Sequence, residues 1–227
     1  MINNLCPVAS KTLVMLVFVS LLAWSCNCEE DSYGEVLDLV IPITTYPDKD
    51  TFHIGDTIWI EAQFNKDIRI LNSTKTIRLE AFTFFTDLGI AEISGETENY
   101  QVDIDTITEI GAIDYLPLHG ALAYPLTFIE EEHYYVFKGA VVLKSKGLFY
   151  LFFSTNGRFY EVPFYDHPKL YVCKNDRRDR VNVHYDNPST SQANYEELFR
   201  QTQVDYLLDL YDYERYKNLG TISFKVL

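Results

Sequence analysis

TIWIEAQF, residues 57–64, alternates between apolar side chains and larger or polar ones without a break. Successive side chains of a β-strand point to opposite faces of a sheet. The stretch therefore predicts a half-buried strand, with Ile58, Ile60, Ala62 and Phe64 facing a core. Trp59 falls on the opposite face, among residues that are otherwise polar.

Similar patterns lie on both sides of this stretch. Residues 37–43 and 133–144 alternate in the same way, and residues 76–85 are expected to form a further strand. Residues 147–153 read GLFYLFF, which predicts a strand buried on both faces. Many strands joined by short turns are typical of a sandwich, so residues 36–160 are expected to form one antiparallel β-sandwich.

The remaining residues, 161–227, are expected to pack on this sandwich as a loop, a helix and a closing strand. The charged run NDRRDR (175–180) is expected in the loop, either paired with itself or binding an anion. Asn194 and Glu197 have the spacing of a capping box, which predicts a helix over 194–218 that ends before Gly220. Residues 221–226 alternate again and are expected to rejoin the sandwich.

Two of these stretches, Gly55–Phe64 and Gly147–Phe153, resemble strands of immunoglobulin-like domains. Such domains often carry a Tyr shortly after the turn glycine, whereas this chain has Phe149 there, and their Cys–Trp–Cys core is absent. The resemblance implies a mainly β fold. The expected architecture is an immunoglobulin-like antiparallel β-sandwich with a C-terminal α-helix inserted before the last strand.

Composition narrows the classes of function. The 227 residues include 33 Asp and Glu against 19 Lys and Arg, a formal net charge of −14. Nucleic-acid binding needs clustered basic residues, so a nucleic-acid partner is not expected. With 47% hydrophobic residues and only four Cys, the chain is neither disordered nor a dense disulfide framework.

The first residues predict export and a lipid anchor. Residues 12–25 form an apolar run behind Lys11, which is too short for a membrane span and typical of a signal peptide over residues 1–25. LAWSC (22–26) resembles the lipobox of bacterial lipoproteins, which implies that Cys26 is acylated, with Cys28 as the alternative. Residues 26–35 then form an acidic tether. Acids directly after the lipidated Cys resemble the surface-export signal of Bacteroidota lipoproteins.

Candidate chemistry is sparse. The chain has no Gly-x-Ser-x-Gly or His-Glu-x-x-His motif, and its five His are scattered. Asp103 and Asp105 fall on one strand face, where they are expected either to face solvent or to bind Ca²⁺. The solvent-facing interpretation is preferred. No catalytic residue, metal or cofactor is therefore predicted.

Aromatic residues are the main candidates for binding. Trp59, Tyr206 and Tyr213 are the candidate ligand-facing residues, because Tyr and Trp stack on sugars and dominate protein interfaces. The competing interpretation packs the helix across the Trp59 face. Asp105-Thr106-Ile107 resembles the O-glycosylation sequon of Bacteroidota, which makes Thr106 a candidate. Cys28 and Cys173 are a candidate disulfide.

The whole chain resembles uncharacterised sandwich lipoproteins of Bacteroidota. The resemblance implies a lipid-anchored outer-membrane protein, exposed at the cell surface, that binds an envelope protein or has a structural role and is not an enzyme. A glycan-binding accessory of a polysaccharide-uptake system is the first alternative. An envelope hydrolase is the second.

Overall fold

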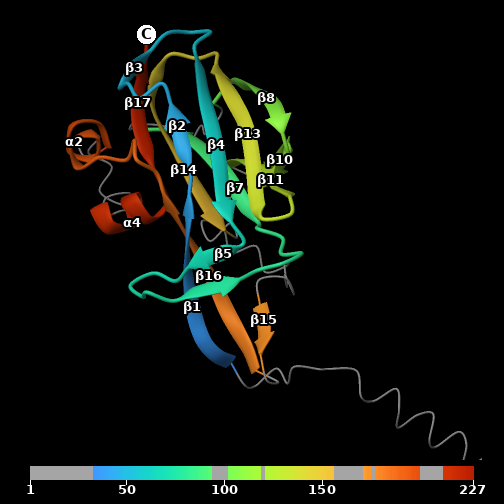
Figure 1. Ribbon diagram of the computed structural model, residues 1–227. Coiled ribbons are helices and arrows are strands. Elements are labelled where there is room, and N and C mark those ends of the chain that lie inside the picture. Colours follow the sequence, from blue (N-terminus) through green and yellow to red (C-terminus); the bar gives the residue numbers. More distant parts are fainter. Residues whose placement is uncertain (1–32, 94–101, 119–120, 156–170, 175–176, 200–211) are drawn as a thin grey trace, which may run out of the picture.

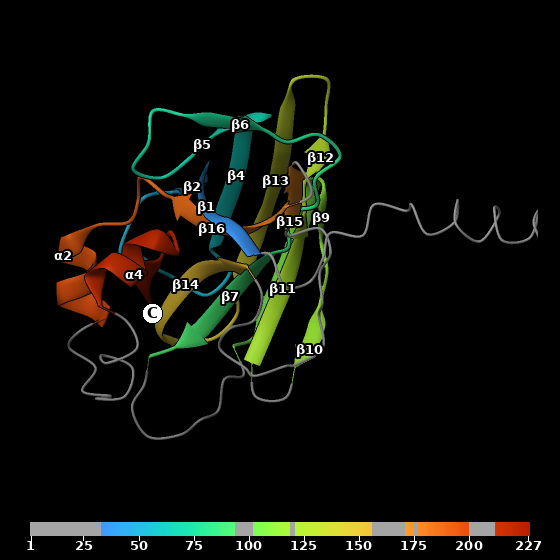
Figure 2. The same ribbon diagram turned by 90° about the horizontal axis from the view of Figure 1, so that it is seen from below.

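A computed structural model describes residues 33–93, 102–118, 121–155, 171–174, 177–199 and 212–227 (Figure 1). These residues form a mainly β protein in which two large sheets pack face to face (Figure 2). The predicted β-sandwich, with a helical segment before the last strand, is confirmed. No helix within the described ranges is long and apolar enough to span a membrane.

The first large sheet has five strands. Its path runs from β12 (Ile129–Glu130) through β13 (Tyr134–Leu143) and β4 (Thr57–Asn65) to β2 (Thr44–Tyr46), and β8 (Ile104–Ile110) also pairs with β13. β4 is the strand predicted from residues 57–64. Its buried and less buried residues alternate, with Ile58, Ile60, Ala62 and Phe64 inside.

The second large sheet has seven strands. Its order is β10 (Leu116–Leu118), β11 (Ala121–Thr127), β7 (Thr86–Glu92), β14 (Gly147–Thr155), β17 (Ile222–Val226) and β3 (Thr51–Phe52), and β9 (Ala112–Ile113) pairs with β11. The closing strand β17 lies between β14 and β3, so residues beyond 161 form part of the main sheet.

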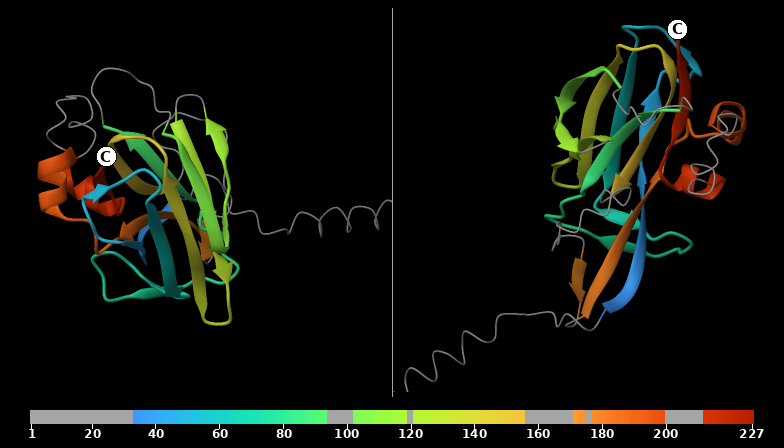
Figure 3. Two further views of the ribbon diagram at one scale, coloured as in Figure 1. Left: turned by 90° about the horizontal axis from the view of Figure 1, so that it is seen from above. Right: turned by 180° about the vertical axis from the view of Figure 1, so that it is seen from behind.

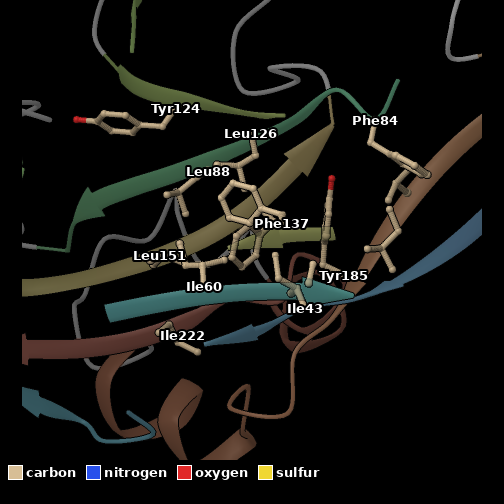
Figure 4. Close-up of a cluster of buried hydrophobic side chains, with 14 of the residues drawn as sticks. Ile43, Ile60, Phe84, Leu88, Tyr124, Leu126, Phe137, Leu151, Tyr185 and Ile222 are labelled. Carbon is tan, nitrogen blue, oxygen red and sulfur yellow. The ribbon is translucent and has the colours of Figure 1, made fainter. Parts of the chain in front are cut away.

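One hydrophobic core fills the space between these sheets (Figure 4). Figure 4 shows Ile60 and Phe137 from the five-stranded sheet beside Leu88 and Leu151 from the seven-stranded sheet. Ile60 and Leu151 are fully buried. Burial of such side chains is the main favourable term in folding, so the apolar residues of β4 and β14 determine how the sheets face each other.

Gly111 joins the two sheets along one side. β8 pairs with β13 in the five-stranded sheet, and β9, directly after Gly111, pairs with β11 in the other. Gly111 has a φ of +87°, and a Cβ there would lie 2.1 Å from the carbonyl oxygen of Thr127. Only glycine fits this conformation and this close approach.

Two smaller sheets complete the fold. β1 (Tyr33–Pro42) pairs in parallel with β16 (Arg177–Asp186), which pairs antiparallel with β15 (Tyr171–Lys174). β5 (Asp67–Arg69) and β6 (Thr76–Arg78) form a hairpin. In Figure 3 the long β1–β16 pair runs past the lower end of the sandwich.

Two sequence predictions are wrong in this region. Residues 161–190 were expected to form a loop with one or two strands, and the charged run was expected in the loop part. Instead, residues 177–180 begin the ten-residue strand β16, because the following residues VNVHY pair with the apolar strand β1. A strand was expected over 76–85, but β6 ends at Arg78. Ala81 then has a φ of +50°, which breaks the extended conformation.

The helical segment begins earlier than the capping box predicted. α2 (Gln192–Asn194) leads into the π-helical η2 (Tyr195–Phe199), and Ser191, not Asn194, is the N-cap. The Ser191 hydroxyl accepts a hydrogen bond from the Asn194 amide at 3.0 Å. After the undescribed residues 200–211, α4 (Tyr213–Asn218) precedes β17.

Gly220 ends α4 as predicted. Its φ is +57°, its amide donates to Lys217, and the Thr221 amide donates to the Tyr216 carbonyl. These two bonds form a Schellman motif, which satisfies the last carbonyls of the helix and turns the chain into β17.

Candidate functional site

The two outer faces of the sandwich differ in what covers them. The described helices pack beside the seven-stranded sheet and do not lie over β4 and β13 (Figures 1 and 3). We call the outer face of the five-stranded sheet, formed by β2, β4, β13, β8 and β12, the open face. It is the candidate functional site.

On the outer face of the seven-stranded sheet, helical residues cover β14 and the end of β7. Tyr195 and Tyr216 form a second hydrophobic cluster with Ala91, Ile93 and Tyr150 of the seven-stranded sheet. The sequence also suggested that the helix packs across the Trp59 face. For the described helical residues, this interpretation is wrong. The reason is that Leu148, Tyr150 and Phe152 form an apolar surface on the outer side of β14, against which Tyr195 and Tyr216 pack.

Hydrogen bonds of the Asn194 side chain hold this helical cover against β17. Its side-chain oxygen accepts hydrogen bonds from the Ser223 amide at 2.6 Å and the Tyr216 hydroxyl at 2.7 Å. Its side-chain nitrogen donates to the Ser223 carbonyl at 2.7 Å and to Asp50 at 2.8 Å. All four hydrogen-bonding positions of the amide are therefore used.

On the open face, strand register brings four side chains into one row. Ile107 of β8 lies opposite Ala140 of β13, Ala140 lies opposite Trp59 of β4, and Trp59 lies opposite Tyr46 of β2. Ile58 and Ile60 point into the core, so Trp59 between them must point outward. The row crosses four strands.

Tyr46 and Trp59 form a fixed aromatic pair at one end of this row. Their ring centroids lie 6.3 Å apart and their planes differ by 12°. The Tyr46 hydroxyl donates to Glu61 at 2.7 Å. Burial, and then the Glu61 carboxylate, raise the pKa of Tyr46, so the hydroxyl keeps its proton and remains a donor.

Lys138 joins the aromatic pair to the β8 side of the face. Its ammonium group lies 3.2 Å from Glu61 and 2.9 Å from Glu109, and 5.4 Å from the centre of the Trp59 ring. Hydrogen bonds to Glu109 and then Glu61 raise the pKa of Lys138. The hydrogen bond from Tyr46, followed by that from Lys138, outweighs burial and lowers the pKa of Glu61. Glu61 and Lys138 are therefore both held in their charged forms.

Exposed isoleucines form the rim of the open face. Ile107, Ile110 and Ile129 are 39%, 42% and 43% exposed. β8 and β12 pair with successive parts of β13, where Ile107, Ile110 and Ile129 lie opposite Ala140, Lys138 and Val136. The three side chains therefore follow one edge of the sheet.

The structure separates the residues that the sequence proposed for binding. Trp59 lies on the open face, whereas Tyr213 lies in α4 against Tyr195 and Tyr216, 5.5 Å and 6.4 Å away between ring centroids. Tyr206, Cys26 and Cys28 lie outside the described residues. Thr106 lies in β8 and is exposed, as a modified residue must be.

Asp105 lies in the same strand and has a partner. Its carboxylate forms an ion pair with Lys144 at 2.5 Å. In the part of the chain that the structure describes, no three His, Cys, Asp or Glu residues gather in a way that could hold a metal ion.

Sequence reasoning missed most of the open face. Residues 46–50 read YPDKD, which is typical of a turn and hides Tyr46, although the alternation of residues 37–43 extends to it. Lys138 was seen only as part of an alternating strand. Its position between Glu61 and Glu109 depends on strand order, which alternation does not encode.

Comparison with known proteins does not identify a family for this chain. No protein-family model matches the chain, and no curated protein matches it. Among solved structures, the chain is similar to a type II cohesin dyad from the adaptor ScaA scaffoldin of Acetivibrio cellulolyticus, with a TM-score of 0.28 and 10% identity. The match covers 64% of this chain and 46% of that chain, so this chain spans less than half the length of that protein.

Proposed function

We propose that this chain is a non-catalytic envelope lipoprotein that binds a protein partner through the open face. The observation that carries the proposal is the fixed Tyr46–Trp59 pair on a face that the described helices leave open. On the outer face of the opposite sheet, a hydrogen-bonded helical cover lies over β14 and the end of β7.

The chemistry of the open face is that of a protein interface. Binding energy in such interfaces concentrates in buried Trp and Tyr, surrounded by less important contacts. Here the Tyr46–Trp59 pair lies in one row with the exposed Ile107, and the single positive charge of Lys138 is shared between Glu61 and Glu109. This cluster keeps one net negative charge, which a basic residue of a partner would balance.

Glycan binding is the second candidate, because Tyr46 and Trp59 lie side by side in a row. A sugar ring stacks on an open aromatic face. At Trp59 the ammonium group of Lys138 lies over the ring and is held there by two carboxylates. This arrangement favours a protein partner over a sugar.

The charge cluster also favours binding over hydrolysis. A general acid must hold a proton near neutral pH, and its pKa is usually raised for that purpose. The pKa of Glu61 is instead lowered, and that of Lys138 is raised. Each group is held in its charged form.

Site-specific cross-linking tests the binding face. A photoreactive amino acid at position 110 or 129, in cells that make the full chain, should give the same discrete cross-linked protein. The same label at Ile54, an apolar residue that is 51% exposed and lies in the turn before β4, is the matched control. Equal cross-linking from position 54 would contradict the assignment of the open face. A complex that contains only glycan would favour the second candidate.

The anchoring proposal has its own test. Acyl chains contribute about 0.8 kcal/mol per buried CH₂ group, so loss of the acylated residue should release the protein from membranes. Cys26→Ala should therefore move the protein from the detergent phase to the aqueous phase in detergent partitioning, whereas Cys28→Ala should not. The reverse pattern would transfer the anchor to Cys28.

A further inference from the structure

β8 is an edge strand that is exposed along its length. It has seven residues and, among the described residues, it pairs only with β13. Every residue from Asp105 to Ile110 is exposed. An edge strand presents a row of backbone donors and acceptors that an added strand can use.

β8 lacks the proline and lysine that protect many edge strands, and its pairing with β13 has one register shift, between Lys138 and Gly139. Natural edges are protected by proline, by lysine or by other charges that repel an incoming strand. The sequence of β8, IDTITEI, contains no Pro or Lys and is rich in β-branched residues, which favour strand pairing. Its two acids form ion pairs with lysines of the same protein, Asp105 with Lys144 at 2.5 Å and Glu109 with Lys138 at 2.9 Å, but their side chains stay 60% and 46% exposed. Such exposed ion pairs are weak, so the two acids still repel an acidic strand and attract a basic one.

Charge argues against a second copy of this chain as the added strand. Full antiparallel overlap of two β8 strands places Ile104 opposite Ile110, and therefore Asp105 opposite Glu109. Like charges directly opposite each other destabilise a strand pair. The formal net charge of −14 on each chain adds a longer-range repulsion.

We propose that the β8 edge binds an extended segment of a protein partner that carries alternating basic and β-branched residues, and that this segment adds a strand to the five-stranded sheet. Main-chain hydrogen bonds would supply affinity, and alternate side chains would supply selectivity. Asp105, Ile107 and Glu109 are two residues apart and share one face of the sheet, so the basic side chains of the segment would lie on that face and the β-branched ones on the face of Thr106 and Thr108. The inference rests on the proposed function, because it names the chemistry of the partner.

Hydrogen exchange of the full-length protein in detergent, measured by mass spectrometry, tests this inference. The probe is a seven-residue peptide of alternating Lys and Val with blocked ends. At ten times its Kd it should slow exchange in residues 104–110 about tenfold. A peptide with Glu in place of Lys should have no effect. A third peptide keeps the lysines but has Pro in place of Val, so it cannot form a ladder, and it should also have no effect.

Two substitutions test whether the peptide binds at β8. Ile107→Lys should weaken peptide binding at least about tenfold, because an edge lysine repels a basic strand. Ile54→Lys, a change of the same charge and size in the turn before β4, should not alter binding. Thermal unfolding of both variants shows whether they remain folded.

Three results would overturn the inference. Equal protection by the proline peptide and by the valine peptide would mean that the attraction is only electrostatic. Equal protection by the acidic peptide would contradict the charge argument. Protection of residues 104–110 that rises with protein concentration alone would identify a second copy as the occupant.

The cross-linking experiment separates this inference from the proposed function. If cross-linking at position 110 finds a protein but the peptide gives no protection, only this inference fails. If no protein is cross-linked, the proposed function fails.

Discussion

Phe137→Ala should lower the free energy of unfolding by about 3–5 kcal/mol, the range for an aromatic side chain removed from a core. Phe137 is 2% exposed and lies in the middle of β13, with its ring 5.7 Å from that of Phe128. Its removal leaves a cavity between the two large sheets that rigid neighbouring strands cannot fill completely.

Val136→Ala is the matched control for this change. Val136 precedes Phe137 in the same strand, but its side chain is only partly buried and lies on the open face. Denaturant unfolding of both variants should show a much smaller loss for Val136→Ala. Equal losses would mean that β13 is shifted by one residue, which would also move Lys138 off the open face.

Asn194→Ala should lower the free energy of unfolding by about 2–5 kcal/mol, because the amide and carbonyl of Ser223 both lose a buried partner and each such loss costs about 1–3 kcal/mol. Ser223 is 1% exposed and Tyr216 is fully buried, so water does not easily replace the lost bonds. The helical cover should also loosen, which hydrogen exchange in residues 213–218 would show.

Glu197→Ala distinguishes this network from the capping box that the sequence suggested. Glu197 is exposed and follows Asn194 by three residues. If Asn194 acts through Ser223 and Tyr216, Glu197→Ala should change stability by less than about 0.5 kcal/mol, as is usual for surface substitutions. A loss of stability as large as that of Asn194→Ala, measured by thermal unfolding, would support the capping box as the role of Asn194.

The strands that the sequence predicted correctly are those that carry their own local pattern. The sequences of β4, β13 and β17 alternate, and β14 is an apolar run buried on both faces, so each follows from neighbouring residues alone. β16 was missed because its first residues are charged. Its pairing with β1 is visible only when residues about 140 positions apart are brought together.

The candidate site was predictable only in part, for the same reason. Trp59 could be identified because it interrupts the polar face of a single strand. Tyr46, Lys138 and Ile107 become its neighbours through the order β2, β4, β13 and β8, which no local pattern specifies. Asn194 was noticed, but a local cap explained it, whereas its actual partners are 22 and 29 residues further along the chain.

The parallel pairing of β1 with β16 has a consequence for how fast the chain folds. Leu39 lies beside Val183, so this ladder cannot close until 144 further residues have been synthesised and brought back. Contacts between residues so distant in sequence slow folding, because the entropy of closing a long loop is lost before the contacts form. During that interval the apolar side of β1, with Leu39 and Ile41, has no strand to cover it. A newly made chain should therefore remain unfolded for longer than a domain with local strand pairs, and it would depend on protection from aggregation in that time.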